Sequence, residues 1–207
     1  STTTSIPEVD VRILWVGAGQ DTPGPTRVPL GSELVFPVCS PRLLPDKKQL
    51  RDRNALASMT LLHKATHTIG EWSWKIWLER LEIDASRRRS GELRFAGMGL
   101  MLSAAVDGSG ATIGRSLLVH DALRDGRLVI PVAGAQPMQS SLMYVARWRR
   151  AKVDDPDIKA FVGWLAAEAA ATLDATRELI RERQEQVRSR TTSAKIAKGA
   201  PRAQTRA

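Results

Sequence analysis

The feature that most constrains the fold is an alternation of short strand-like runs with amphipathic helix patterns along most of the chain. Runs with period-two alternation or continuous apolar character lie at 9–15, 33–39, 59–62, 92–96, 111–114, 127–132 and 142–148. The clearest helix between them places Trp74, Trp77, Leu78 and Leu81 on one face. This order predicts an α/β protein with largely parallel sheets covered by helices.

Local signals add further elements. Ser40-Pro41 is typical of a helix start, and Pro37 indicates a sheet edge or a crossing between lobes. A helix follows Gly97, with Gly108 where a left-handed cap is needed, and another is expected at 117–123. The last helix begins at Asp155-Pro156 and continues, more weakly, to about Arg188; its predicted inner face is Ile158, Phe161, Val162, Leu165 and Ala169.

The net charge of +9 is concentrated at the end of the chain. Between Arg181 and Ala207 there are eight basic and two acidic residues, so this tail carries most of the excess. It has few apolar residues, and we expect it to be disordered from about Thr191 onward. A solvated tail is favoured over a phosphate-binding arm, because no aromatic residue is interleaved with its charges.

The sequence places the protein in the cytoplasm by default. It contains neither an apolar run long enough to span a membrane nor a legible signal peptide. Its single cysteine, Cys39, is interpreted as a small buried residue rather than a reactive thiol. Because the chain opens on Ser1 rather than methionine, we expect a truncated product with something missing in front.

No arrangement of residues indicates catalysis, a metal or a cofactor. A Gly-x-Ser-x-Gly elbow is absent, and the spacing of His63 and His67 is better explained by chance than by a metal site. Gly97-Met98-Gly99 opens a helix but lacks the third glycine of a dinucleotide fingerprint. Its helix N-terminus remains suited to a carboxylate ligand.

Six stretches, in order, carry a family resemblance. They are Asp10-Val11-Arg12-Ile13 with Trp15 and Gly17-Ala18-Gly19; 33–41 (ELVFPVCSP); Leu61-Leu62-His63 with the tryptophan helix; 104–115 (AAVDGSGATIGR); 126–129 (GRLV); and Phe161-x-x-Trp164-Leu165-x-x-Glu168. Together, over roughly Val9 to Ala169, they resemble the effector domain of LysR-type transcriptional regulators, in the branch of the glycine-cleavage activators.

The resemblance implies a periplasmic-binding-protein-like fold: two α/β lobes joined by crossing strands, with a small-molecule effector in the cleft. Residues 1–35 would be a remnant of lobe I, 36–130 lobe II, and 131–175 the closing part of lobe I. Residues 176–207 would form a charged helix extension and a disordered basic tail. In the family the opening strand and helix of lobe I and the winged helix-turn-helix come earlier, so lobe I is expected to be incomplete here. DNA contact would occur only through that absent domain.

Five positions match the family's effector site. Trp15 would cover an apolar or aromatic effector, although a structural tryptophan explains it equally well. Gly97 and Met98 would present a helix N-terminus to the effector, and Thr112 lies in the strand that follows. Ser103 matches a position where the family often has a polar side chain, although an ordinary surface serine is the competing interpretation. The sequence departs from the family's first motif at Arg12, Leu14 and Val16, which predicts a different effector or loop conformation.

The function implied is effector binding within a homo-oligomeric transcription regulator, with no reaction, no cofactor and no membrane partner. A solute-binding protein of a transporter shares the architecture and is the first alternative. A deaminase-like enzyme is the second, but the paired acid, base and cofactor lysine that it requires are not found.

Overall fold

A single six-stranded sheet runs through the molecule in this computed structural model, which describes residues 9–17, 23–44, 53–66, 70–84, 86, 90–132 and 135–199. In spatial order the strands are β1 (Val11–Gly17), β6 (Met138–Trp148), β2 (Arg27–Cys39), β5 (Ala111–Arg115), β3 (Leu61–Lys64) and β4 (Glu92–Phe95). The β1–β6, β6–β2 and β2–β5 pairs are antiparallel, and β3 is parallel to both of its neighbours.

The α/β class is correct, but the expectation of largely parallel sheets is wrong. Strand–helix alternation constrains neighbours along the chain, whereas β1, β2 and β6 pair across long sequence separations.

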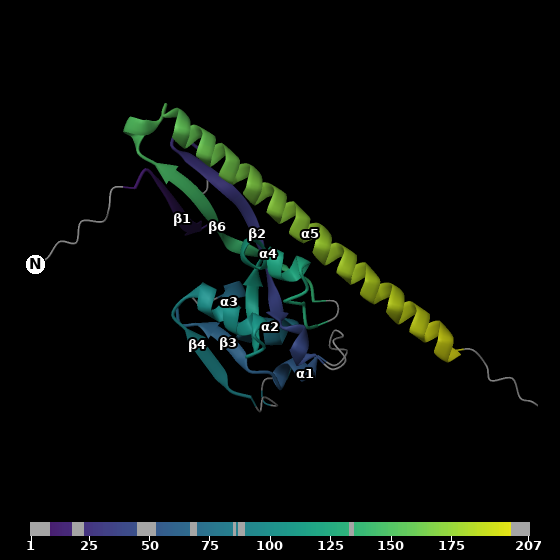
Figure 1. The fold of residues 1–207 in the computed structure, drawn as a ribbon. Coiled ribbons are helices and arrows are strands. Elements are labelled where there is room, and N and C mark those ends of the chain that lie inside the picture. The colour runs from purple at the N-terminus through teal and green to yellow at the C-terminus, as the bar shows by residue number, and fades with distance from the viewer. Residues whose placement is uncertain are drawn as a thin grey trace, which may run out of the picture.

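Strand β2 connects two parts of this sheet. It pairs with β6 from Arg27 to Val35 and with β5 from Val35 to Cys39. We call β1, β6 and the start of β2 the first sheet part, and β5, β3, β4 and the end of β2 the second sheet part (Figure 1). Pro37 lies in the crossing stretch of β2, as predicted. There β5 is the one strand that pairs with β2, so on the other side of Pro37 no strand needs the N–H that proline lacks.

Four helices pack around the second sheet part (Figure 1): α1 (Asn54–Ala57), α2 (Trp74–Arg80), α3 (Met98–Val106) and α4 (Ser116–Arg124). Trp74 and Trp77 are buried on α2, as their spacing predicts, and each donates its indole N–H to a backbone carbonyl, at 3.1 and 2.8 Å. Trp72, on the short 3-10 helix η3 (Gly70–Trp72), remains half-buried. Cys39 is fully buried, and burial raises the pKa of its thiol to about 12, which fits the interpretation as a packing residue.

Two expected elements are shorter than the pattern predicts. The helix start at Ser40 yields only the 3-10 helix η1 (Pro41–Leu43), where the Ser40 hydroxyl accepts a backbone N–H of the first turn. The strand expected at 127–132 is reduced to isolated bridge positions at Val129 and Val132, and Val129 pairs with Cys39 at the end of β2. Pro131 follows closely and has no N–H with which to extend a ladder.

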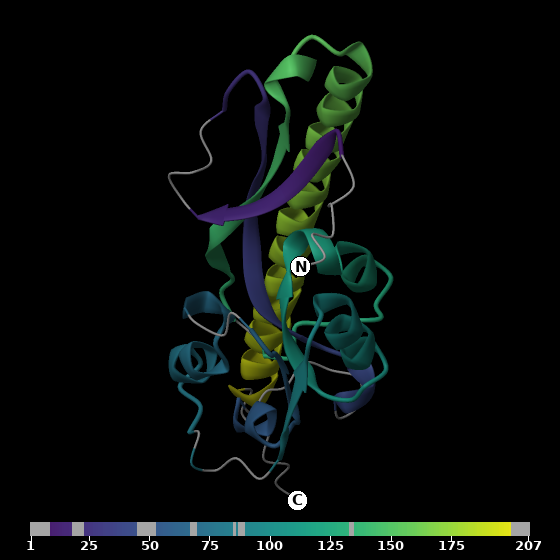
Figure 2. The same cartoon turned by 90° about the vertical axis from the view of Figure 1, so that its left-hand side faces the viewer.

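The C-terminal helix α5 (Pro156–Gly199) is longer than predicted. It follows the 3-10 helix η5 (Arg150–Lys152) and passes behind both sheet parts (Figure 2). Its helical backbone continues to Gly199, so the expected disorder is wrong for 191–199, because extending an existing helix costs far less than starting one. Positions 200–207 of the expected disordered tail lie outside the described residues. The buried stripe of α5 is Ile158, Val162, Ala169, Leu173, Thr176 and Ile180. Phe161, expected on this stripe, lies beside it and is 44% exposed.

Candidate effector cavity

A small cavity lies where the two sheet parts meet. Its described lining comes from five elements: Trp15 of β1; Leu62, His63 and Lys64 of β3; Trp72 of η3; Met98 and Met101 of α3; and Thr112 and Ile113 of β5. Trp15 is the one residue in this set from the first sheet part. The cavity measures about 20 Å³, which is room for little more than one water molecule.

The structure brings together three of the five residues singled out in the sequence. Trp15, Met98 and Thr112 all line the cavity. Gly97 is the N-cap of α3 and adjoins the cavity through Met98, but it is not part of the described lining. Ser103 is exposed on α3 and points elsewhere, because α3 turns Met98 and Met101 toward the cavity and this leaves position 103 on its outer side.

An aromatic enclosure around Arg115 borders the cavity. The guanidinium carbon of Arg115 lies 4.5 Å from the centroids of Trp15 and Tyr144 and 5.1 Å from that of Trp72. The Trp15 and Trp72 rings also meet edge to face, with centroids 5.1 Å apart. Cation–π attraction is strongest where the cation is desolvated, and Arg115 is only 3% exposed. The same two indoles therefore hold an internal cation and line the cavity.

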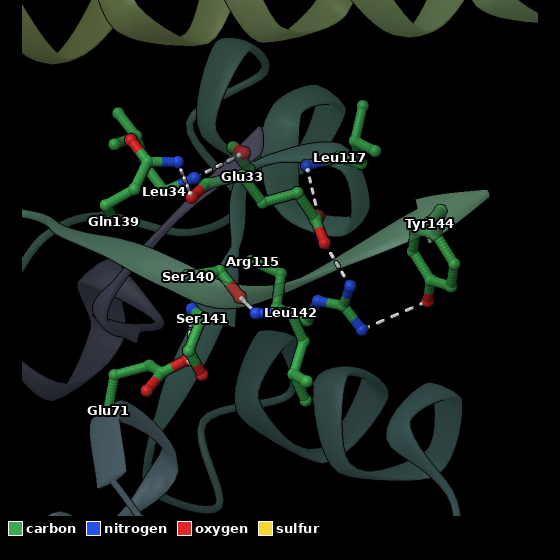
Figure 3. A network of polar contacts seen from close by, with 11 residues as sticks. Glu33, Leu34, Glu71, Arg115, Leu117, Gln139, Ser140, Ser141, Leu142 and Tyr144 are labelled. Atoms are coloured by element: carbon green, nitrogen blue, oxygen red, sulfur yellow. Dashed lines mark hydrogen bonds and ion pairs between the residues drawn. The ribbon is translucent and has the colours of Figure 1, made fainter. Parts of the chain in front are cut away.

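Arg115 is neutralised by Glu33, which is fully buried on β2 (Figure 3). Arg115 hydrogen-bonds one carboxylate oxygen, and the backbone N–H of Leu117 donates to the other at 3.2 Å. Arg115 also donates to the Tyr144 hydroxyl at 3.1 Å. Burial raises the pKa of Glu33, although Arg115 and the Leu117 N–H act in the opposite direction. The pair joins β2, β5 and β6 where the sheet parts meet.

A second polar contact joins η3 to β6 (Figure 3). One carboxylate oxygen of Glu71 accepts both the backbone N–H and the hydroxyl of Ser141, each at 2.7 Å. Burial acts to raise the pKa of Glu71, but its hydrogen bonds, with those from Ser141 the largest, together outweigh burial and lower the pKa. This contact holds η3, and with it Trp72, against the first sheet part.

Sequence reasoning missed most of the polar surroundings of the cavity. His63 was weighed as a metal ligand and counted in a family motif but not assigned to the site, yet it lines the cavity, with Nε2 3.5 Å from a carboxylate oxygen of Glu92. His67 lies outside the described residues. Trp72 did carry a signal, because it falls off the buried stripe of α2. The partnership of Glu33 and Arg115 spans 82 positions, and no local pattern predicts such a pair.

Neither a metal-binding cluster nor a membrane-spanning helix is found among the described residues. Within the described ranges, no group of three or more histidine, cysteine, aspartate or glutamate side chains is arranged to hold a metal ion. In the same part of the chain, no helix combines the length and apolar character needed to cross a membrane. The long helix α5 is instead rich in charged side chains.

Comparison with known families decides the assignment of this fold. Residues 8–170, most of the chain, match the LysR substrate binding domain. The chain belongs to the LysR substrate-binding domain family. The family's effector-binding domains have the periplasmic-binding-protein-like fold expected from the sequence.

The chain is similar to the glycine cleavage system transcriptional activator of Escherichia coli (strain K12), with 31% identity over 164 residues. The match covers 79% of this chain and 51% of the activator, so the chain spans about half the length of that relative. The resemblance to the glycine-cleavage-activator branch is thereby confirmed.

Solved structures support the fold. The effector binding domain of AmpR from Citrobacter freundii superposes with a TM-score of 0.58 at 21% identity, covering 79% of this chain and 76% of that one. The effector domain of AmpR from Pseudomonas aeruginosa gives a TM-score of 0.58 at 22% identity, with coverages of 83% and 76%. At these identities the likeness concerns the fold alone.

Proposed function

We propose that this LysR-family domain binds a small-molecule effector in the cavity between its two sheet parts and, as part of a transcription regulator, reports that binding. The observation that carries the proposal is the position of Trp15, which meets the second sheet part across the cavity. A ligand that moves this ring acts on both parts at once. It shifts the equilibrium between their arrangements only if it binds one arrangement more tightly.

The lining favours a small apolar or aromatic carboxylate. Trp15, Trp72 and Met98 supply apolar and aromatic walls, while Thr112 and Lys64 supply a hydroxyl and an ammonium group. A carboxylate gains further from the N-terminus of α3, which begins at Met98. Because the cavity of about 20 Å³ is smaller than any such ligand, binding requires Trp15 or Trp72 to move away from the other.

The protein acts as a cytoplasmic homo-oligomer that carries out no reaction, and any contact with DNA is made by a separate N-terminal domain. The lobes divide near residues 36 and 130. The division near residue 36 is supported by strand β2, which pairs with β6 before Val35 and with β5 after it. The similar curated proteins are transcriptional activators and regulators, which argues against the transporter alternative.

Calorimetric titration with acetate, benzoate and indole-3-acetate tests the proposal. We expect saturable binding of at least one aromatic carboxylate, weakened roughly tenfold or more in Trp15→Ala, since the lost stacking face is worth about 1.5–3 kcal/mol. Thr112→Val keeps the side-chain shape and removes only the hydroxyl, so it tests the polar contact separately.

Trp164→Ala is the matched control, because this tryptophan is 58% exposed on α5, and it should bind as the parent does. The proposal fails if none of the three carboxylates binds saturably. It fails equally if Trp15→Ala and Trp164→Ala bind alike.

A further inference from the structure

Three arginines lie in cross-strand register on the first sheet part. Arg12 of β1 is paired with Arg147 of β6, and Arg147 is paired in turn with Arg27 of β2. Paired positions project their side chains to the same face, and neighbouring strands are about 4.8 Å apart, so the three Cα atoms form a row roughly 10 Å long. We call these residues the arginine row.

The arginine row has no ion-pair partner among the described residues. No hydrogen bond or ion pair there engages the guanidinium groups of Arg12, Arg27 or Arg147. The Nε and Nη2 atoms of Arg27 are buried without a hydrogen-bond partner. Like charges on directly paired strand positions destabilise a sheet, and a buried N–H without an acceptor adds a further cost. An anion bound between Arg12 and Arg147 would remove the like-charge penalty of that pair.

An open groove of about 650 Å³ lies beside the row. Its described lining is Val9, Asp10, Arg12, Leu14, Arg147, Trp148 and Arg149. The acidic member, Asp10, is already engaged by Lys152, with its carboxylate oxygen 2.6 Å from Nζ, and this contact lowers the pKa of Asp10. The groove shares no lining residue with the effector cavity.

We propose that this groove is a second binding site, which takes a small ligand carrying a diphosphate group. Each guanidinium offers a planar fork of donors that matches two phosphate oxygens, and adjacent guanidiniums in a row suit adjacent phosphates. The volume of the groove is that of a small-ligand site. A nucleic-acid backbone suits it less, because a row roughly 10 Å long offers few contacts to a longer chain of phosphates.

Calorimetric titration of the full chain with inorganic pyrophosphate at low salt tests the site. We expect saturable one-to-one binding, weakened at least about tenfold by Arg12→Gln and by Arg147→Gln, since each removes a charge-assisted contact. Both side chains are exposed, so neither change empties the core. Arg42→Gln removes the same charge from an exposed position on η1 and should bind like the parent. Circular dichroism of each variant establishes that it is folded.

Two further ligands complete the experiment. Inorganic phosphate should bind more weakly than pyrophosphate, because it spans fewer members of the row. A mixed-sequence DNA duplex is titrated in parallel. Absence of saturable pyrophosphate binding overturns the proposal, as does an equal loss in Arg42→Gln and Arg147→Gln. Duplex binding that depends on Arg147 without pyrophosphate binding would also overturn it, in favour of a nucleic-acid surface.

Discussion

At the scale of single residues, the Glu33–Arg115 pair determines how the cavity wall is built. A buried ion pair is weak evidence for stability, because desolvating both charges offsets much of their attraction. Here, however, each partner has additional contacts: the Leu117 N–H on the carboxylate, and three aromatic rings around the guanidinium. The structural consequence of the pair is that Arg115 holds in place the Trp15 and Trp72 indoles, which line the cavity.

Removing one partner of this pair should be costly. Glu33→Gln leaves the Arg115 guanidinium buried without its counter-charge, and we expect a loss of about 3–5 kcal/mol in the free energy of unfolding. Urea denaturation measures it. Glu82→Gln is the matched control, because Glu82 pairs with Arg53 on the surface, where such pairs are worth about 0–1 kcal/mol. Equal losses in the two variants would show that the buried pair is unimportant.

Single-residue signals predicted only part of the site. Trp15, Met98 and Thr112 were identified because their positions match a family pattern, and the structure places them around one cavity. Ser103 fits the same pattern but is exposed, since its side of α3 depends on how the helix docks. Glu33 gave no signal, because a charged residue that opens an apolar strand run is usually read as a surface position.

At the scale of elements, α5 holds the two sheet parts together. Near its start Ile158 and Val162 pack on the first part, and farther along Ile180 joins the core of the second. Side-chain contacts reinforce the packing: Thr176 contacts His120 of α4 at 2.9 Å, and Arg183 donates to the Leu123 carbonyl at 2.6 Å. Relative motion of the two parts must therefore accommodate α5.

The contact of α5 with β2 provides a test of this packing. Gly31 has φ of +89°, and a Cβ added there would lie 2.6 Å from Cδ1 of the buried Leu173. We expect Gly31→Ala to lower the free energy of unfolding by about 1–3 kcal/mol in urea, through backbone strain and overpacking. Adding Leu173→Ala should relieve the clash but not the strain, so the two changes should be less than additive.

Gly163→Ala is the control for this substitution. Gly163 lies within α5, and a Cβ there would meet nothing within 4 Å. Alanine favours a helix interior over glycine by up to about 1 kcal/mol, so this variant should be as stable as the parent or more stable. If Gly31→Ala matched Gly163→Ala in stability, the described contact between β2 and α5 would be wrong.

Elements were predicted where local pattern determines them. The buried face of α2 follows from the spacing of its tryptophans, and the start of α5 from Asp155-Pro156. The antiparallel pairing of β1 with β6 was missed because the two strands lie over 100 residues apart. The end of α5 was misplaced because the scarcity of apolar residues in the tail was read as disorder, although a helix already anchored by packing continues through residues of fair propensity.

At the scale of the whole molecule, the two sheet parts meet at one cavity and share one long helix. The cavity receives a single described wall residue, Trp15, from the first part, so its shape depends directly on how the parts are arranged. The proposed diphosphate groove lies on the first part alone. Binding in the cavity should therefore change the relation between the parts, whereas binding in the groove should leave it unchanged.

The most direct test of the central claim is to follow the indole N–H resonances of the chain's six tryptophans by NMR during titration with the aromatic carboxylates. Single Trp→Phe variants assign the signals. The account predicts that the Trp15 and Trp72 signals shift together along one saturating curve while that of exposed Trp164 stays in place. It is contradicted if the Trp15 and Trp72 signals do not move with any of these ligands, or if Trp164 moves as much as they do.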